Sequence, residues 1–257
     1  MIDAHTIRVS YTWVVTQDLP ELELTGDPGE VWHVGFEPDP WGWAPWHYAN
    51  DSGLFDGRWD DQLGEFRTLY TADSLLGCFL ELLARFRPSE RVQAALDEIV
   101  DDDGSVGQYP EAPQGGVGYR WLEDRLYGRA RQAGRYCAIT HSRTLGALSK
   151  SYPLGRHGLT PRDVDAALLK DARDRDFTRS VARWLHDLHD GGSPLVDGVQ
   201  FASRHGDELR MWAVFERADS SYRSSHLEPL SEPVRVTPDT PELLEAFERF
   251  GLHWHEA

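Results

Sequence analysis

Apolar and polar positions alternate in several segments of the chain, and this alternation predicts strands. The segment IRVSYTWVV shows the alternation well, and EFRTLYTA adds β-branched and aromatic residues that strands favour. Two late segments, DGVQFASRH and ELRMWAVFE, are predicted as strands joined at His205-Gly206-Asp207. The predicted strands cover residues 7–15, 65–72, 135–140, 197–205 and 208–216.

Between the strands, apolar residues recur at helical spacing. After the strand at 65–72, Asp73 or Ser74 can accept a hydrogen bond from the free amides of the next turn and so begin a helix, which Pro88 closes. A serine directly after this proline predicts the cap of a second helix. The further helices are predicted at residues 89–100, 160–172, 176–190 and 240–250.

Two segments are predicted to be irregular. Residues 40–57 combine prolines, glycines and bulky aromatic residues and indicate a packed loop, and residues 101–118 are rich in turn formers. The sequence shows no internal repeat and no linker that would separate two domains. Because helices and strands mix without a strict βαβα alternation, we expect a single domain over residues 1–257 of the α+β class.

Composition and charge narrow the range of functions. With 257 residues, 40% of them hydrophobic, the chain can bury a substantial core. Its formal charge of −17 disfavours diffuse binding to nucleic acid or to an anionic membrane, so an anionic ligand would need a local cluster of arginines. Neither a secretory leader nor a long apolar span is apparent. Cys78 and Cys137 fit no zinc or disulfide framework, and we expect a protein of the reducing cytoplasm.

A single acidic residue, Glu81, interrupts the apolar helix that begins near residue 74. It points away from the centre of the apolar arc, and Arg85, four residues later, could pair with it on an exposed face. The other residues on that face are small, however, and leave room for a ligand or another element to approach. They are Ser74, Gly77, Cys78 and Ala84. Helix geometry therefore leaves two interpretations open, a solvated ion pair or the carboxylate of a functional site.

Two blocks of sequence resemble the RES family of bacterial proteins, which is named for an arginine, a glutamate and a serine. The first is GRWD followed by LGEFRTLYTADSLLGCFLELL, and the second is DGVQFASRHGDELRMWAVFE. On this resemblance the three residues are Arg58, Glu81 and Ser203, and Tyr70 stands where the family has a tyrosine. The similarity runs from about residue 56 to 216. It leaves a long insertion at about 100–190, an aromatic-rich extension at 1–55 and a C-terminal helix at 240–250.

The resemblance implies a fold related to the ADP-ribosyltransferases, with a split, twisted β core and flanking helices around a cleft. It also implies an enzyme that degrades NAD, as a substrate rather than a cofactor, by cleaving the nicotinamide–ribose bond. Several family members are toxins held inactive by a helix-turn-helix antitoxin, and some use inorganic phosphate as co-substrate. We therefore expect an NAD phosphorylase acting as a toxin. An NAD glycohydrolase, an ADP-ribosyltransferase and a non-catalytic nucleotide-binding protein remain alternatives, and a homodimer is left open.

Under this interpretation Glu81, Arg58 and Ser203 are the expected catalytic residues. Glu81 would stabilise the positive charge that develops on the ribose. Arg58 and Arg204 would bind phosphate groups, because the planar guanidinium suits phosphate oxygens. Ser203 would donate or accept a hydrogen bond rather than act as a nucleophile, since no histidine and aspartate form a recognisable triad with it.

The remaining candidates are aromatic and histidine residues. Trp59 and Tyr70 could stack on a substrate ring or wall it in, although an aromatic residue beside an apolar helix is more often part of the core. The histidine pairs of HDLH and HWH bring no further ligand at zinc spacing, so no metal is expected.

Overall fold

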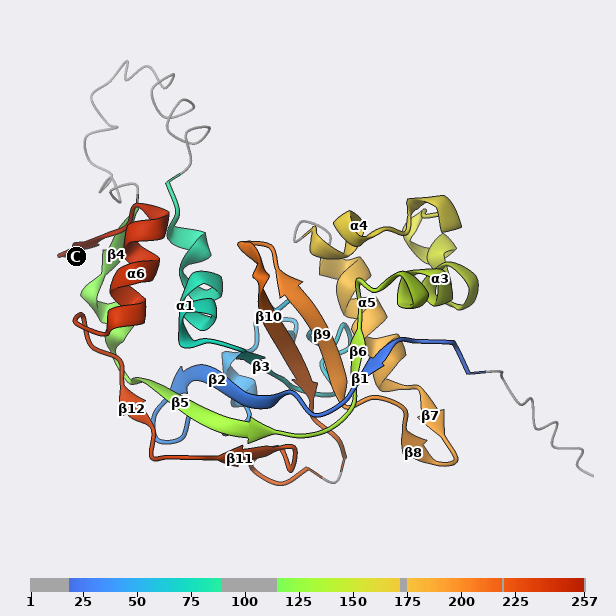
Figure 1. Cartoon of the computed structure of the whole chain (residues 1–257), viewed down its shortest axis with the longest axis horizontal. Helices are drawn as coiled ribbons and strands as arrows, with labels where there is room; N and C mark the ends of the chain where they lie inside the picture. Colours follow the sequence, from blue (N-terminus) through green and yellow to red (C-terminus); the bar gives the residue numbers. More distant parts are fainter. Residues whose placement is uncertain (1–18, 89–114, 172–174, 219, 257) are drawn as a thin grey trace, which may run out of the picture.

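The computed structural model describes residues 19–88, 115–171, 175–218 and 220–256 (Figure 1). The strand predicted at 7–15, the helix predicted at 89–100 and most of the irregular segment at 101–118 lie outside the described residues.

Nine strands of the described chain form one curled sheet in the order β1-β6-β9-β10-β3-β2-β5-β11, with β12 also paired to β5. The pairs are antiparallel except for β6 and β9, which are parallel. The strands are β1 Leu24–Thr25, β2 Gly29–Phe36, β3 Thr68–Ala72, β5 Arg125–Gln132, β6 Tyr136–Ala138, β9 Gly198–Ser203, β10 Gly206–Phe215, β11 Leu227–Pro229 and β12 Val234–Arg235.

The sheet divides into two halves between β2 and β3. These strands pair where Trp32 lies opposite Ala72, whereas β2 pairs with β5 from Gly29 to Phe36. In Figure 1, β2 and β5 lie across the base of the molecule and β9 and β10 rise away from them. The predicted α+β class with a split, twisted β core is therefore confirmed.

The strand predictions at 65–72, 135–140, 197–205 and 208–216 correspond to β3, β6, β9 and β10. The turn between β9 and β10 falls at Arg204 and His205, earlier than predicted. A register shift between Gly206 and Arg210 bends this hairpin.

Helix α1, Leu75–Leu83, confirms the predicted helix after β3. The Ser74 hydroxyl caps it by accepting a hydrogen bond from Gly77 N at 3.1 Å. A 3₁₀ turn, Ala84–Phe86, follows before Pro88. Helix α6, Pro241–Phe250, packs against α1 and confirms the helix predicted at 240–250, although the Thr240 hydroxyl accepts from Thr237 N instead of capping the helix.

The other described helices lie on the opposite side of the β9–β10 hairpin (Figure 1). They are α3 Ser142–Ser151, α4 Ala166–Lys170 and α5 Arg175–His186. The helix predicted at 160–172 is divided, because Asp163 accepts hydrogen bonds from Thr160 in a 3₁₀ turn and Asp165 then caps the short α4. The helix predicted at 176–190 ends at His186.

Short elements complete the described fold. Strand β4, Gly116–Gly118, pairs in parallel with β13, His253–His255, and β7, His189–Asp190, pairs with β8, Ser193–Pro194. Besides the 3₁₀ turn that follows α1, the described chain has 3₁₀ turns at Trp46–Tyr48, Tyr119–Leu122, Leu154–His157 and Pro161–Asp163. None of the helices described here is long and apolar enough to span a bilayer.

Two apolar cores hold the sheet. The larger one joins α1, α5 and α6 to β9 and β10 through residues such as Phe79, Phe177 and Phe247. The smaller one contains Trp41, which is fully buried, and Trp212. Part of the predicted N-terminal extension is thus integral to the fold, because it supplies both strand β2 and Trp41.

Candidate functional site

A cavity of about 620 Å³ opens between α1, the β9–β10 turn, strand β2 and the 3₁₀ turn at 119–122. Its wall is rich in arginine although the chain as a whole is acidic. The charged residues of the wall are Arg58, Arg85, Arg125, Arg175, Arg204, Asp56 and Glu81. Among the described residues, no three His, Cys, Asp or Glu side chains are placed to hold a metal ion.

Glu81 and Ser203, two of the predicted site residues, lie together. The fully buried Ser203 hydroxyl donates a hydrogen bond to Glu81 Oε1 at 2.7 Å and accepts one from His205 N at 2.9 Å. This pair of bonds fixes one carboxylate oxygen of Glu81 on the cavity wall. Of the two interpretations of Glu81, the geometry favours the carboxylate of a functional site.

Arg58 enters the same cavity from the loop before β3. Its guanidinium lies over the Phe201 ring, 5.1 Å from the centroid, and the residue as a whole is only 7% exposed. Burial lowers the pKa of Arg58, and the negative charge of Glu81 opposes that shift. The hydrogen bond that Arg58 makes within the described chain is a long one, from Nη1 to Leu169 O at 3.5 Å, so most of its donors are available to a ligand.

The GRWD loop is held by Tyr70. The Tyr70 hydroxyl donates to Asp60 Oδ1 at 3.0 Å and accepts from Trp59 N at 2.9 Å, and burial raises the pKa of both Tyr70 and Asp60. A Cβ at Gly57 would collide with the Tyr70 hydroxyl, which explains the glycine beside Arg58. Tyr70 lines the cavity. Trp59, the other predicted aromatic, is instead fully buried and packs on Phe201 with ring centroids 5.8 Å apart.

Arg204, predicted as a second phosphate ligand, lies exposed at the cavity rim and its Nε donates to His205 Nε2 at 3.3 Å. The neighbouring His205 was not singled out from the sequence. Burial lowers its pKa and the charge of Glu81 opposes the shift. Its buried Nδ1 has no partner among the described residues.

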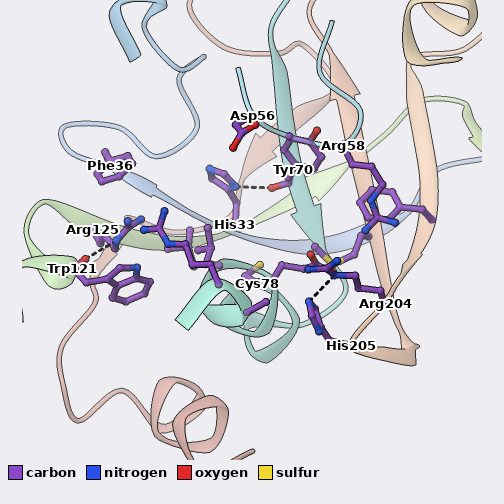
Figure 2. A pocket seen from close by; sticks show the side chains of 18 of the residues that line it. His33, Phe36, Asp56, Arg58, Tyr70, Cys78, Trp121, Arg125, Arg204 and His205 are labelled. Atoms are coloured by element: carbon purple, nitrogen blue, oxygen red, sulfur yellow. Dashed lines mark hydrogen bonds between the residues drawn. The ribbon is translucent and has the colours of Figure 1, made fainter. Parts of the chain in front are cut away.

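Three other wall residues could not be assigned from sequence. His33 lies on β2, where burial lowers its pKa to about 4, and Nδ1 bonds to Tyr70 O at 2.6 Å. Arg125 lies on β5 between two aromatic rings, and Arg175 begins α5. Strands β2 and β5 were not predicted, and a lone arginine or histidine in an unassigned segment carries no signal of its own. Figure 2 shows His33 between the group at Arg125 and the group at Arg58, Arg204 and His205.

The chain belongs to the RES domain family, whose model matches residues 30–237. No curated protein matches its sequence. Among solved structures, the chain is similar to one from the crystal structure of the M. tuberculosis MbcT–MbcA toxin–antitoxin complex. The identity is 16% and the TM-score 0.41, over 88% of this chain and 92% of that one.

Proposed function

We propose that the cavity binds NAD and that the protein cleaves the nicotinamide–ribose bond. The observation that carries this proposal is the Ser203–Glu81 hydrogen bond of 2.7 Å on the wall of an arginine-rich cavity. Membership of the RES domain family supports the same reaction, because the resemblance implies degradation of NAD.

Glu81 acts on the ribose in this proposal. Ser203 donates to Oε1, and no donor of the described chain reaches Oε2, which is therefore free for the 2′-hydroxyl of the ribose. As the glycosidic bond breaks, the ribose C1′ gains positive charge, and an adjacent carboxylate lowers the energy of that state. The electron pair of the bond returns to the positively charged ring nitrogen, so nicotinamide leaves as a neutral molecule.

Arg58 and Arg204 bind the pyrophosphate. A guanidinium remains charged and donates two parallel hydrogen bonds to phosphate oxygens. Arg58 is held over Phe201 and forms no ion pair with a carboxylate of the described chain, so it can bind the ligand with little reorganisation.

Inorganic phosphate is the acceptor that we propose. An oxygen of HPO₄²⁻ attacks C1′ as the bond to nicotinamide breaks, which yields ADP-ribose 1″-phosphate without any net proton transfer. The exposed Arg204 supports this choice, because it lies next to Ser203 at the cavity rim and can donate to a second anion. Hydrolysis would need a base to activate water, whereas phosphate is already an anion.

The biological role that we propose is that of a cytoplasmic toxin restrained by a helix-turn-helix antitoxin. This follows from the family resemblance alone. In a host that expresses the chain by itself, we expect growth arrest and loss of cellular NAD, and both should be relieved by a co-encoded protein that covers the cavity.

The decisive experiment compares Glu81→Gln with wild type, each incubated with NAD in the presence and absence of phosphate, with mass detection of the products. Glutamine can still accept the Ser203 hydrogen bond, so the thermal midpoint should stay within a few degrees while NAD loss stops. Glu245→Gln is the matched control, because Glu245 pairs with Arg249 four residues later on α6, as Glu81 could with Arg85. Wild-type consumption of NAD by Glu81→Gln would disprove the role of Glu81.

A further inference from the structure

A second cationic group lies at the other end of the cavity. The Arg125 guanidinium carbon is 4.5 Å from the centroid of Phe36 and 4.4 Å from that of Trp121, and Nε donates to Trp121 O at 2.6 Å. Figure 2 shows Arg125, Phe36 and Trp121 together, at the end of the cavity opposite Arg204 and His205. The two rings and the hydrogen bond to Trp121 O therefore fix this guanidinium. Its Nη atoms donate no hydrogen bond to another described residue.

Arg125 has a cation rather than a carboxylate beside it. Among the described residues, neither Arg125 nor Arg85 forms an ion pair with an acidic side chain. Burial and the charge of Arg85 lower the pKa of Arg125 to about 10, which still leaves it charged at neutral pH. A partly buried pair of like charges is unfavourable unless an anion joins it.

The charges that act on Arg125 differ from those that act on Arg58. The pKa of Arg58 responds to Glu81, Arg204 and Arg175, whereas the charge that acts on Arg125 is that of Arg85. The cavity therefore offers two anion sites. The first includes Arg58 and Arg204 near Glu81, and the second is formed by Arg125 at the opposite end of the cavity and by Arg85, one helical turn after Glu81.

We propose that Arg85 and Arg125 bind a phosphate on the 2′-oxygen of the adenosine ribose, so that the preferred substrate is the 2′-phosphorylated dinucleotide, NADP. This inference rests on the proposed function. If the nicotinamide ribose and the pyrophosphate lie among Glu81, Arg58 and Arg204, the part of the cavity left for the adenosine is the end at Arg125. There Phe36 and Trp121 offer ring surface to adenine, and a guanidinium edge suits a terminal phosphate, as arginines do in other NADP sites.

The test measures binding without turnover. Adenosine 2′,5′-bisphosphate and adenosine 5′-monophosphate are titrated calorimetrically into wild type, Arg125→Gln, Arg85→Gln and Arg129→Gln. Arg129 is the control, because it lies on β5 like Arg125 but pairs with Glu30 at 3.1 Å and does not line the cavity. Arg85 is exposed, so its variant tests the site even if Arg125→Gln fails to fold.

Wild type and the Arg129 variant should bind the bisphosphate at least about tenfold more tightly than the monophosphate, which is the effect of one charge-assisted hydrogen bond. Arg85→Gln and Arg125→Gln should lose most of this preference and keep their affinity for the monophosphate. Equal affinity of wild type for the two ligands would overturn the proposal. So would an equal loss of affinity for both ligands in Arg125→Gln, because that result would place the 5′-phosphate at this site. Cleavage of NAD and NADP is measured separately. If wild type shows no preference for the bisphosphate but still consumes NAD, this inference fails and the proposed function stands.

Discussion

Replacing Ser203 with alanine should separate the positioning of Glu81 from the binding of substrate. Ser203 is fully buried and does not line the cavity, yet its hydroxyl holds Glu81 Oε1 at 2.7 Å. Without it, the carboxylate can turn away from the place where we propose that the ribose binds, and the His205 amide loses the acceptor it now has at 2.9 Å.

The size of the effect follows from these two contacts. A hydrogen bond to a charged group contributes about 1.5–3 kcal/mol, and an orphaned buried donor costs about 1–3 kcal/mol. Because the His205 amide is only partly buried, water can replace its lost acceptor, and we expect the free energy of unfolding of Ser203→Ala to fall by about 1.5–3 kcal/mol, mainly from the bond to Glu81. Because a small displacement of a catalytic group costs up to about 100-fold in rate, kcat should fall by about 10- to 100-fold, with KM changed much less.

The matched control is Ser180→Ala. Ser180 is also buried and its hydroxyl bonds to the Tyr152 hydroxyl, but it lies on α5 and does not line the cavity. This variant should lose comparable stability in chemical denaturation and keep its kcat for NAD. If Ser203→Ala has a wild-type kcat, or if Ser180→Ala loses as much, Ser203 does not position the catalytic carboxylate.

Two further predictions concern Arg58 and His33. Arg58→Lys keeps the charge but loses the planar fork, so NAD should bind more weakly by about 1–3 kcal/mol, and an unchanged Kd in calorimetry would exclude Arg58 as a phosphate ligand. The pKa of His33 is about 4 in the folded protein against its ordinary value of 6.5, so the unfolded chain takes up its proton first as the pH falls. The free energy of unfolding should therefore decrease from pH 6.5 to pH 4, by at most about 3 kcal/mol from this residue. Denaturation of His33→Gln should show a pH dependence that is shallower by this amount, and an identical dependence would contradict the assignment.

Local sequence signals were sufficient to predict helix α1 and to name candidate residues on and around it. The Ser74 cap and Pro88 delimit the helix, and the resemblance to the RES family assigned Arg58, Glu81 and Ser203 from their sequence motifs. That Glu81 bonds to Ser203 across 122 positions could not be deduced from spacing, because it depends on how β9 lies against α1. Residue type alone misassigned Trp59, since this aromatic residue, next to the arginine proposed to bind phosphate, is part of the core.

Strand β5 shows why the rest of the cavity was missed. Its sequence, RLYGRARQ, has few of the residues that favour strands, and the strand depends on pairing with β2 from Gly29 to Phe36. Gly128 in its centre lies directly under Trp41, where a Cβ would come within 2.9 Å of the indole nitrogen. Arg125 thus reaches the cavity through long-range packing that no window of sequence contains.

The chain is acidic overall and its cavity is cationic, because the described arginines inside and outside the cavity differ in whether they pair with carboxylates. Outside the cavity many of them form ion pairs with carboxylates, as Arg183 does with Asp61, Glu65 and Asp187. The cavity differs, since Arg58, Arg85, Arg125 and Arg204 all line it and none forms an ion pair with a described carboxylate. An excess of acidic residues would readily supply partners, so leaving these four unpaired keeps positive charge where an anionic substrate would bind. Because the net charge of −17 repels that same anion at long range, affinity must come from short, directed contacts, and NAD binding should depend only weakly on ionic strength.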